Sequence, residues 1–127
     1  MSYLLNSASI HPQVCLVKGK NDEKVYAMKI LKKIDLLSRR EAAFFMEERN
    51  ALIHSSLSEW ITKLYAAFQD EEHLYLVMEF AAGGSLRSLL GSRDTLFLEE
   101  EARFYIAEIA ISLEHLHSFG YVHRDIK

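Results

Sequence analysis

The sequence predicts an α+β fold in which a small antiparallel β-sheet with one helix precedes a mainly helical part. Four short β-prone runs lie between residues 14 and 80, and a helical pattern separates the first two from the last two. A long amphipathic pattern covers residues 99–118. Two adjacent glycines, Gly83 and Gly84, stand between the strand-rich half and the helical half.

The composition is that of a globular domain, because 50% of the 127 residues are hydrophobic and 26% are charged. A formal net charge of -3 argues against a nucleic-acid or anionic-membrane surface as the main partner. Cys15 is the single cysteine, which excludes an intramolecular disulfide, and residues 1–6 carry no basic segment or long apolar run. We therefore expect a cytoplasmic protein without a membrane span, engaged in catalysis or protein contact.

Six histidines raise the question of a metal site. His115 and His117 are two residues apart in a predicted helix, so their side chains point to different faces. This spacing is not typical of metal ligands, and we expect no metal site in the chain.

The first two β-prone runs, Val14–Val17 and Val25–Ile30, flank a polar, turn-rich stretch that is typical of a β-hairpin. The two-residue period of a strand places Lys29 on the same face as Val25 and Ala27. A lysine at the end of an apolar face reaches either solvent or a negatively charged partner. Lys29 is therefore a candidate functional residue.

The segment Ser38–Glu41 fits a capping box and predicts a helix that runs to about Leu52. Glu48 shares a face of this helix with apolar side chains, where an unpaired carboxylate would be costly. Lys29 is one candidate partner for it. The alternative pairs Glu48 with Arg49 or another local charge at the surface, and periodicity alone leaves both open.

The remaining β-prone runs, Trp60–Phe68 and His73–Phe80, are joined by a short polar connection that is typical of an antiparallel hairpin. The glycine-containing stretch Ala81–Ser85 predicts a hinge. A short helix is expected from about Leu86, and a longer one over Glu99–Ser118. These boundaries predict one partial domain with a small lobe at 1–80, a hinge at 81–85 and the start of a larger lobe at 86–127.

The long helix has three glutamates in its first turn, which complement the helix dipole. Leu98, at the expected N-cap, is a poor capping residue, and Gly120 supplies a stop. The apolar positions that recur at helical spacing predict a core scaffold; they are Ala102, Tyr105, Ile106, Ile109, Ala110, Leu113 and Leu116.

Four segments, taken in order, resemble the eukaryotic protein kinase domain over about residues 14–127. They are Val25-Tyr26-Ala27-Met28-Lys29, Glu47-Glu48-Arg49-Asn50, Leu76-Val77-Met78-Glu79-Phe80-Ala81-Ala82-Gly83-Gly84 and Tyr121-Val122-His123-Arg124-Asp125-Ile126-Lys127. A single one of these segments is weak evidence for the family, but the four segments in this order are specific for it. The resemblance implies a protein-kinase-like, truncated fold.

Further phrases look like the AGC group of kinases, and within it like the myotonic-dystrophy-kinase, Rho-associated-kinase and citron-kinase branch. These phrases are Trp60-Ile61-Thr62-Lys63-Leu64, Ala67-Phe68-Gln69-Asp70, Leu74-Tyr75-Leu76-Val77-Met78-Glu79 and Ala102-Arg103-Phe104-Tyr105.

The resemblance implies that ATP is the bound nucleotide. By that resemblance Lys29 holds the α- and β-phosphates and Glu48 is its helix partner. The other implied contacts are Val14 and Ala27 as the roof over adenine, Met78 as the gatekeeper, and the backbone of Glu79 and Ala81 at the adenine edge.

The resemblance also implies transfer of the γ-phosphoryl group of Mg-ATP to a Ser or Thr hydroxyl of a protein substrate. Asp125 would accept the hydroxyl proton and Lys127 would steady phosphoryl charge. The family's asparagine and D-F-G aspartate, which hold Mg²⁺, would fall after Lys127. The 127-residue chain alone is therefore expected to be inactive and to bind Mg²⁺ only as part of a complete parent.

The sequence departs from the family pattern at further positions. The lost glycines and the early end of the chain favour a second hypothesis, whereas the intact Lys29, Glu48 and Asp125 favour enzyme ancestry. The family's phosphate-loop glycines fall at Ser7, Ser9 and Pro12, where the backbone is less free and proline removes an N–H donor. The first strand of the family's sheet is missing or vestigial. Ser85 stands in the place of an acidic residue that in relatives helps bind ribose or substrate. The alternative is thus a truncated, catalytically inactive pseudokinase-like module with regulatory protein partners.

Overall fold

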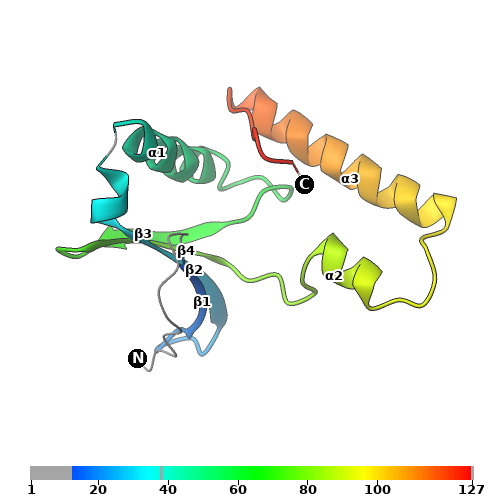
Figure 1. Cartoon of the computed structure of the whole chain (residues 1–127), viewed down its shortest axis with the longest axis horizontal. Helices are drawn as coiled ribbons and strands as arrows, with labels where there is room; N and C mark the ends of the chain where they lie inside the picture. Colours follow the sequence, from blue (N-terminus) through cyan, green and yellow to red (C-terminus); the bar gives the residue numbers. More distant parts are fainter. Residues whose placement is uncertain (1–12, 38, 127) are drawn as a thin grey trace. The chain divides into compact units, whose positions relative to one another are not determined.

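The computed structural model describes residues 13–37 and 39–126, which form two compact units (Figure 1). Of the described residues, 13–37, 39–57 and 62–80 form the first unit, called the strand unit. Residues 58–61 and 81–126 form the second, called the helical unit. The chain therefore passes between the units around residues 58–61 and again after Phe80.

The strand unit is built on a four-stranded sheet of order β1-β2-β4-β3, in which every neighbouring pair is antiparallel. The strands are β1 (Gln13–Lys18), β2 (Val25–Lys32), β3 (Leu64–Gln69) and β4 (His73–Glu79). Both predicted hairpins are confirmed, because β1 pairs with β2 and β3 pairs with β4.

The predicted start of the third strand at Trp60 is wrong, since β3 begins at Leu64. Trp60 and Ile61 belong to the helical unit. The Trp60 N–H donates to Ser58 Oγ at 3.2 Å, and the Trp60 ring lies 6.2 Å from the ring of His115. Tertiary contacts thus override the β-propensity of this segment, as they commonly do.

The core of the strand unit is small and lies around the two central strands. Met28 on β2 and Leu76 on β4 are both 0% exposed. Phe45, at 7% exposure, comes from helix α1 (Arg39–His54), which follows the short 3₁₀ helix η1 (Lys33–Leu36). The predicted helix is confirmed with two more residues at its end, while the proposed cap Ser38 lies outside the described residues.

The turn between β3 and β4 is organised by the carboxylate of Asp70. Asp70 Oδ1 accepts the N–H groups of Glu72 at 2.9 Å and His73 at 2.6 Å, and Oδ2 accepts the Tyr75 hydroxyl at 2.6 Å. The Tyr75 bond, followed by the backbone bonds, lowers the pKa of Asp70 to about 2. An ionised carboxylate is the form that can accept all three hydrogen bonds.

We expect this turn to make the stability of the strand unit decrease as the pH falls through the acid range. Because the folded pKa of Asp70 lies below its usual value, its contribution is fully present above about pH 4 and is lost as pH falls toward 2. Urea unfolding between pH 5 and pH 2 should show a shallower loss of stability in Asp70→Asn than in the wild type. The same replacement at the exposed Asp35 is the control, and equal pH profiles for Asp70→Asn and wild type would contradict the assignment.

The helical unit contains α2 (Leu86–Gly91) and α3 (Glu99–Ser118), both close to their predicted positions. Ser85 caps α2, because its Oγ accepts the Ser88 N–H at 3.1 Å. Gly84 precedes this cap at φ +75°, a conformation that suits glycine. Gly120, at φ +82°, ends α3 as predicted.

The start of α3 is held by side chains other than that of its N-cap residue Leu98. The Glu101 carboxylate accepts the Leu98 N–H at 2.9 Å and two hydrogen bonds from Arg93 at 2.8 and 3.2 Å. The Arg93 guanidinium, which also lies 4.9 Å from the Phe97 ring centroid, lowers the pKa of Glu101. The predicted apolar stripe is present, but no α3 residue is buried.

Candidate functional site

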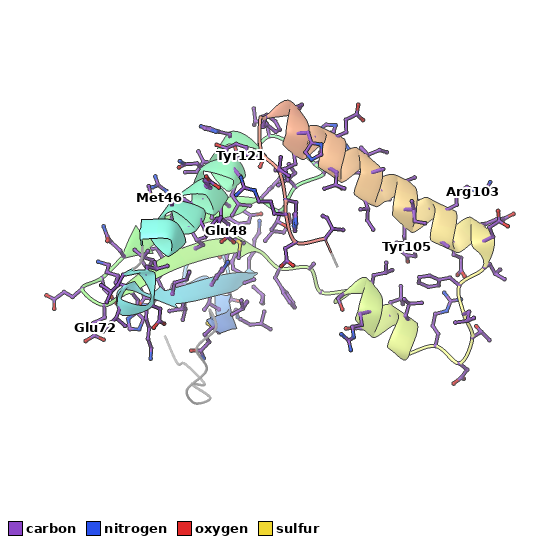
Figure 2. All side chains as sticks on the ribbon, turned by 45° about the horizontal axis from the view of Figure 1, so that its top comes forward. Met46, Glu48, Glu72, Arg103, Tyr105 and Tyr121 are labelled. Atoms are coloured by element: carbon purple, nitrogen blue, oxygen red, sulfur yellow. The ribbon has the colours of Figure 1, made fainter. Side chains whose placement is uncertain are left out.

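The strand unit brings Lys29 of β2 and Glu48 of α1 together as an ion pair. Lys29 Nζ lies 2.7 Å from each of the two Glu48 carboxylate oxygens. The side chains are 18% and 40% exposed, respectively, so the pair is partly withdrawn from water. Figure 2 labels Glu48 on α1. The predicted pairing with Lys29 is therefore confirmed, and the alternative of a local surface partner is not what the structure shows.

The sheet register explains why Lys29 has an apolar setting. Lys29 pairs with Val14 on β1 and with Leu76 on β4, and directly paired residues have side chains on one face. Leu76 is fully buried beside it. A charged side chain at this position is stabilised by an opposite charge, which Glu48 provides.

The same face of the sheet carries the other residues that the sequence singled out in this unit. Ala27 pairs with Leu16 on β1 and with Met78 on β4. These three residues lie beside Lys29 and its paired neighbours on the same face. Val14 is 60% exposed, while Ala27 and Met78 are partly buried. The result is a partly open, apolar surface that ends in a paired lysine.

The end of β4 supplies backbone groups rather than side chains. The Glu79 N–H donates to the Lys63 carbonyl at 2.9 Å, so any further contact from the Glu79 backbone has to use its carbonyl oxygen. Ala81, in the helical unit, accepts the Gly84 N–H on its carbonyl at 3.2 Å. Both residues are exposed.

Asp125 lies in the helical unit after α3 and is exposed. Its N–H donates to His123 Nδ1 at 3.2 Å. Arg124 between them has φ +64°, which is uncommon for a residue other than glycine. Lys127, like Ser7, Ser9 and Pro12, lies outside the described residues.

A groove that the sequence analysis did not predict lies between α1 and the strands β3 and β4. Its volume is about 680 Å³, and its lining includes Phe45, Met46 and Arg49 on α1 and Leu74 and Tyr75 on β4. Figure 2 labels Met46, which is 45% exposed. The sequence indicated only that the predicted helix carries several apolar residues. Periodicity does not show which of these residues line a groove.

Within residues 13–37 and 39–126, no three His, Cys, Asp or Glu side chains are grouped so that they could share a metal ion. The helices in this part of the chain are also too short or too polar to cross a membrane.

The match to a family model described as the protein kinase domain covers residues 11–127, and the chain belongs to this family. The chain is 50% identical over 115 residues to Serine/threonine-protein kinase MRCK beta of Homo sapiens and to MRCK alpha of Mus musculus. Each alignment covers 91% of this chain and 7% of the relative. Myotonin-protein kinase of Homo sapiens is also 50% identical over 115 residues, with 18% of that protein covered.

These relatives confirm the predicted branch of the AGC kinases, and the family match confirms the kinase-like α+β fold. The chain spans less than a fifth of the length of these curated relatives. The two units of the structure agree with this fold, because one carries an antiparallel sheet with a single α-helix and the other carries helices.

Proposed function

We propose that this chain forms the nucleotide-binding elements and the start of the catalytic loop of an ATP-dependent serine/threonine protein kinase. The observation that carries the proposal is the Lys29–Glu48 ion pair, with both oxygen–nitrogen distances at 2.7 Å, at the end of an apolar sheet face. A lysine fixed in this way presents its ammonium group as a pre-positioned partner for phosphate oxygens.

The sheet face around the pair has the properties that an adenine ring requires. Ala27 leaves space for a flat ring, and Val14 and Met78 offer apolar contact on the same face. The Glu79 carbonyl can accept a hydrogen bond from the exocyclic amine of adenine. Lys29 would then pair with the α- and β-phosphates, while Glu48 keeps its ammonium in place.

In the proposed reaction the Asp125 carboxylate accepts the proton of a substrate Ser or Thr hydroxyl. The hydroxyl oxygen forms a bond to the γ-phosphorus as the bond between that phosphorus and the β,γ-bridging oxygen breaks, and ADP leaves. Lys127 would steady the charge on the transferred group. Mg²⁺ would supply charge neutralisation, as it does in the family, and we assign no step to the metal.

The proposed substrates are protein Ser and Thr hydroxyls, consistent with the names of the serine/threonine-protein kinase relatives. Regulatory protein partners are part of the same proposal. So is a cytoplasmic location, because ATP and protein substrates of kinases are both present there.

The activity can be tested in a fusion in which Lys127 is followed by the remainder of the kinase domain of human myotonin-protein kinase. With radiolabelled ATP and a Ser/Thr peptide library, the proposal predicts peptide phosphorylation. An inert but folded fusion would favour the pseudokinase-like alternative, for which the specific observation is that Ser85 acts as a helix cap at the position where the family resemblance implies an acidic residue.

A further inference from the structure

Helix α1 carries Glu48, yet much of one side of it borders open space. The groove of about 680 Å³ separates α1 from β3 and β4, and Met46 and Ile53 on this side are 45% and 41% exposed. Close packing, which normally fixes a helix on a sheet, is therefore incomplete here. The position of α1 depends on the buried Phe45, on the ion pair itself, and on the segments that connect the helix to the sheet.

The segment leading into α1 is fixed to the β3–β4 turn by Lys33. This residue follows β2 directly and opens η1, and α1 begins soon afterwards at Arg39. The Lys33 N–H donates to the Glu72 carbonyl at 2.8 Å, and Lys33 Nζ donates to the Asp70 carbonyl at 2.6 Å. Lys33 thus joins the start of η1 to the turn through one backbone hydrogen bond and one side-chain hydrogen bond.

Asp70 gives the turn the shape that receives this lysine. Its carboxylate accepts the Glu72 and His73 N–H groups, and these bonds set the direction of the carbonyls that Lys33 uses. The same carboxylate accepts the hydroxyl of Tyr75, which lines the groove and stacks on Phe68 at 4.8 Å. The turn therefore organises both the approach to α1 and the groove wall opposite it.

We propose that Lys33 and Asp70 are positioning residues, forming a tether that sets the location of α1 and thereby keeps Glu48 within reach of Lys29. Neither residue contacts the nucleotide in this account. The inference rests on the proposed function only in that the ion pair it positions is assigned to ATP binding. All the residues of the tether and of the ion pair lie in the strand unit.

The expected size of the effect follows from the geometry of the pair. Because both nitrogen–oxygen distances are 2.7 Å, a shift of α1 by about 1 Å takes Glu48 beyond good hydrogen-bond distance. The bond from Lys33 Nζ is charge-assisted but solvent-exposed. Its loss should raise the population of displaced helix by about threefold to tenfold, the range expected for one such hydrogen bond.

The position of α1 can be read by pulsed electron paramagnetic resonance in the full 127-residue chain. Spin labels are placed at the exposed positions Ala43 on α1 and Lys63 beside β3, in a Cys15→Ser background. We expect one main distance in the parent and an increase of about threefold or more in the fraction outside it in Lys33→Met and in Asp70→Ala.

Two controls make this measurement decisive. Lys32→Met removes the same charge from the exposed neighbouring residue and should leave the distribution unchanged. Glu48→Gln weakens the ion pair itself and should displace the helix, which shows that a displacement is detectable. Melting temperatures recorded in parallel separate displacement from general destabilisation, since a displaced but folded helix widens the distribution below the melting range.

The tether is overturned if Lys33→Met and Asp70→Ala keep the parent distribution while Glu48→Gln changes it, or if Lys32→Met has the same effect as Lys33→Met. If Asp70→Ala does not fold, Lys33→Met decides alone, because it leaves the hydrogen bonds of the Asp70 carboxylate in place. No nucleotide is present in these experiments. A failure of ATP to bind to a chain with the parent distribution would count against the proposed function and leave the tether standing.

Discussion

Replacing Asp125 by Asn in the kinase-domain fusion should lower kcat for peptide phosphorylation by about 10²- to 10⁴-fold, the usual contribution of a general base. The amide has nearly the same shape as the carboxylate but cannot take the hydroxyl proton. KM for ATP should change little, because Asp125 is not among the residues proposed to contact the nucleotide. Steady-state kinetics with radiolabelled ATP provide the measurement.

Asp94→Asn is the matched control, because Asp94 is also an exposed aspartate of the helical unit and has no proposed role in the reaction. Its kcat should equal that of the unmodified fusion. If Asp125→Asn keeps the full kcat, the role assigned to this residue is wrong, even if the fusion is an active kinase.

Leu76→Ala should lower the free energy of unfolding of the strand unit by about 2–5 kcal/mol. Leu76 is 0% exposed in the central strand β4 and pairs with Lys29 on one side and Ala67 on the other. Its removal leaves a cavity beside the ion pair, in a core that contains few other fully buried side chains. Such a loss is a large part of the stability of a typical domain, which is about 5–15 kcal/mol.

Urea unfolding followed by far-ultraviolet circular dichroism tests this prediction. Leu57→Ala is the control, since Leu57 is 94% exposed and its replacement should change the free energy of unfolding by no more than about 0.5 kcal/mol. Equal effects of the two replacements would show that β4 is not the centre of the core.

The strands and helices were predictable where local pattern decides the structure. The period-two pattern placed Lys29 and Ala27 on one sheet face, and helical spacing placed Glu48 among apolar residues. These two patterns made Lys29 one of two candidate partners for Glu48, and only the fold decides between them. The helix over Glu99–Ser118 was equally clear, because its apolar spacing and its stop at Gly120 agree with each other.

The features that sequence reasoning missed depend on contacts between distant residues. Trp60 lies outside the strand in which it was predicted, and its ring is 6.2 Å from the ring of His115, a distant residue that the local sequence does not specify as a neighbour. The tether from Lys33 to the Asp70 carbonyl joins residues far apart in the chain, and a backbone carbonyl leaves no signature in the sequence. The groove beside α1 is likewise a consequence of how two elements pack.

Titration calorimetry with ATP on a double-mutant cycle of Lys29→Met and Glu48→Gln tests the central claim most directly. If Lys29 binds the phosphates and Glu48 acts through it, Lys29→Met should weaken ATP binding by about tenfold or more, equivalent to about 1.4 kcal/mol. Glu48→Gln should weaken it less, the double variant should resemble Lys29→Met, and Lys32→Met should bind as the wild type does. ATP affinity that is unchanged by Lys29→Met, or effects of the two replacements that simply add, would contradict the account.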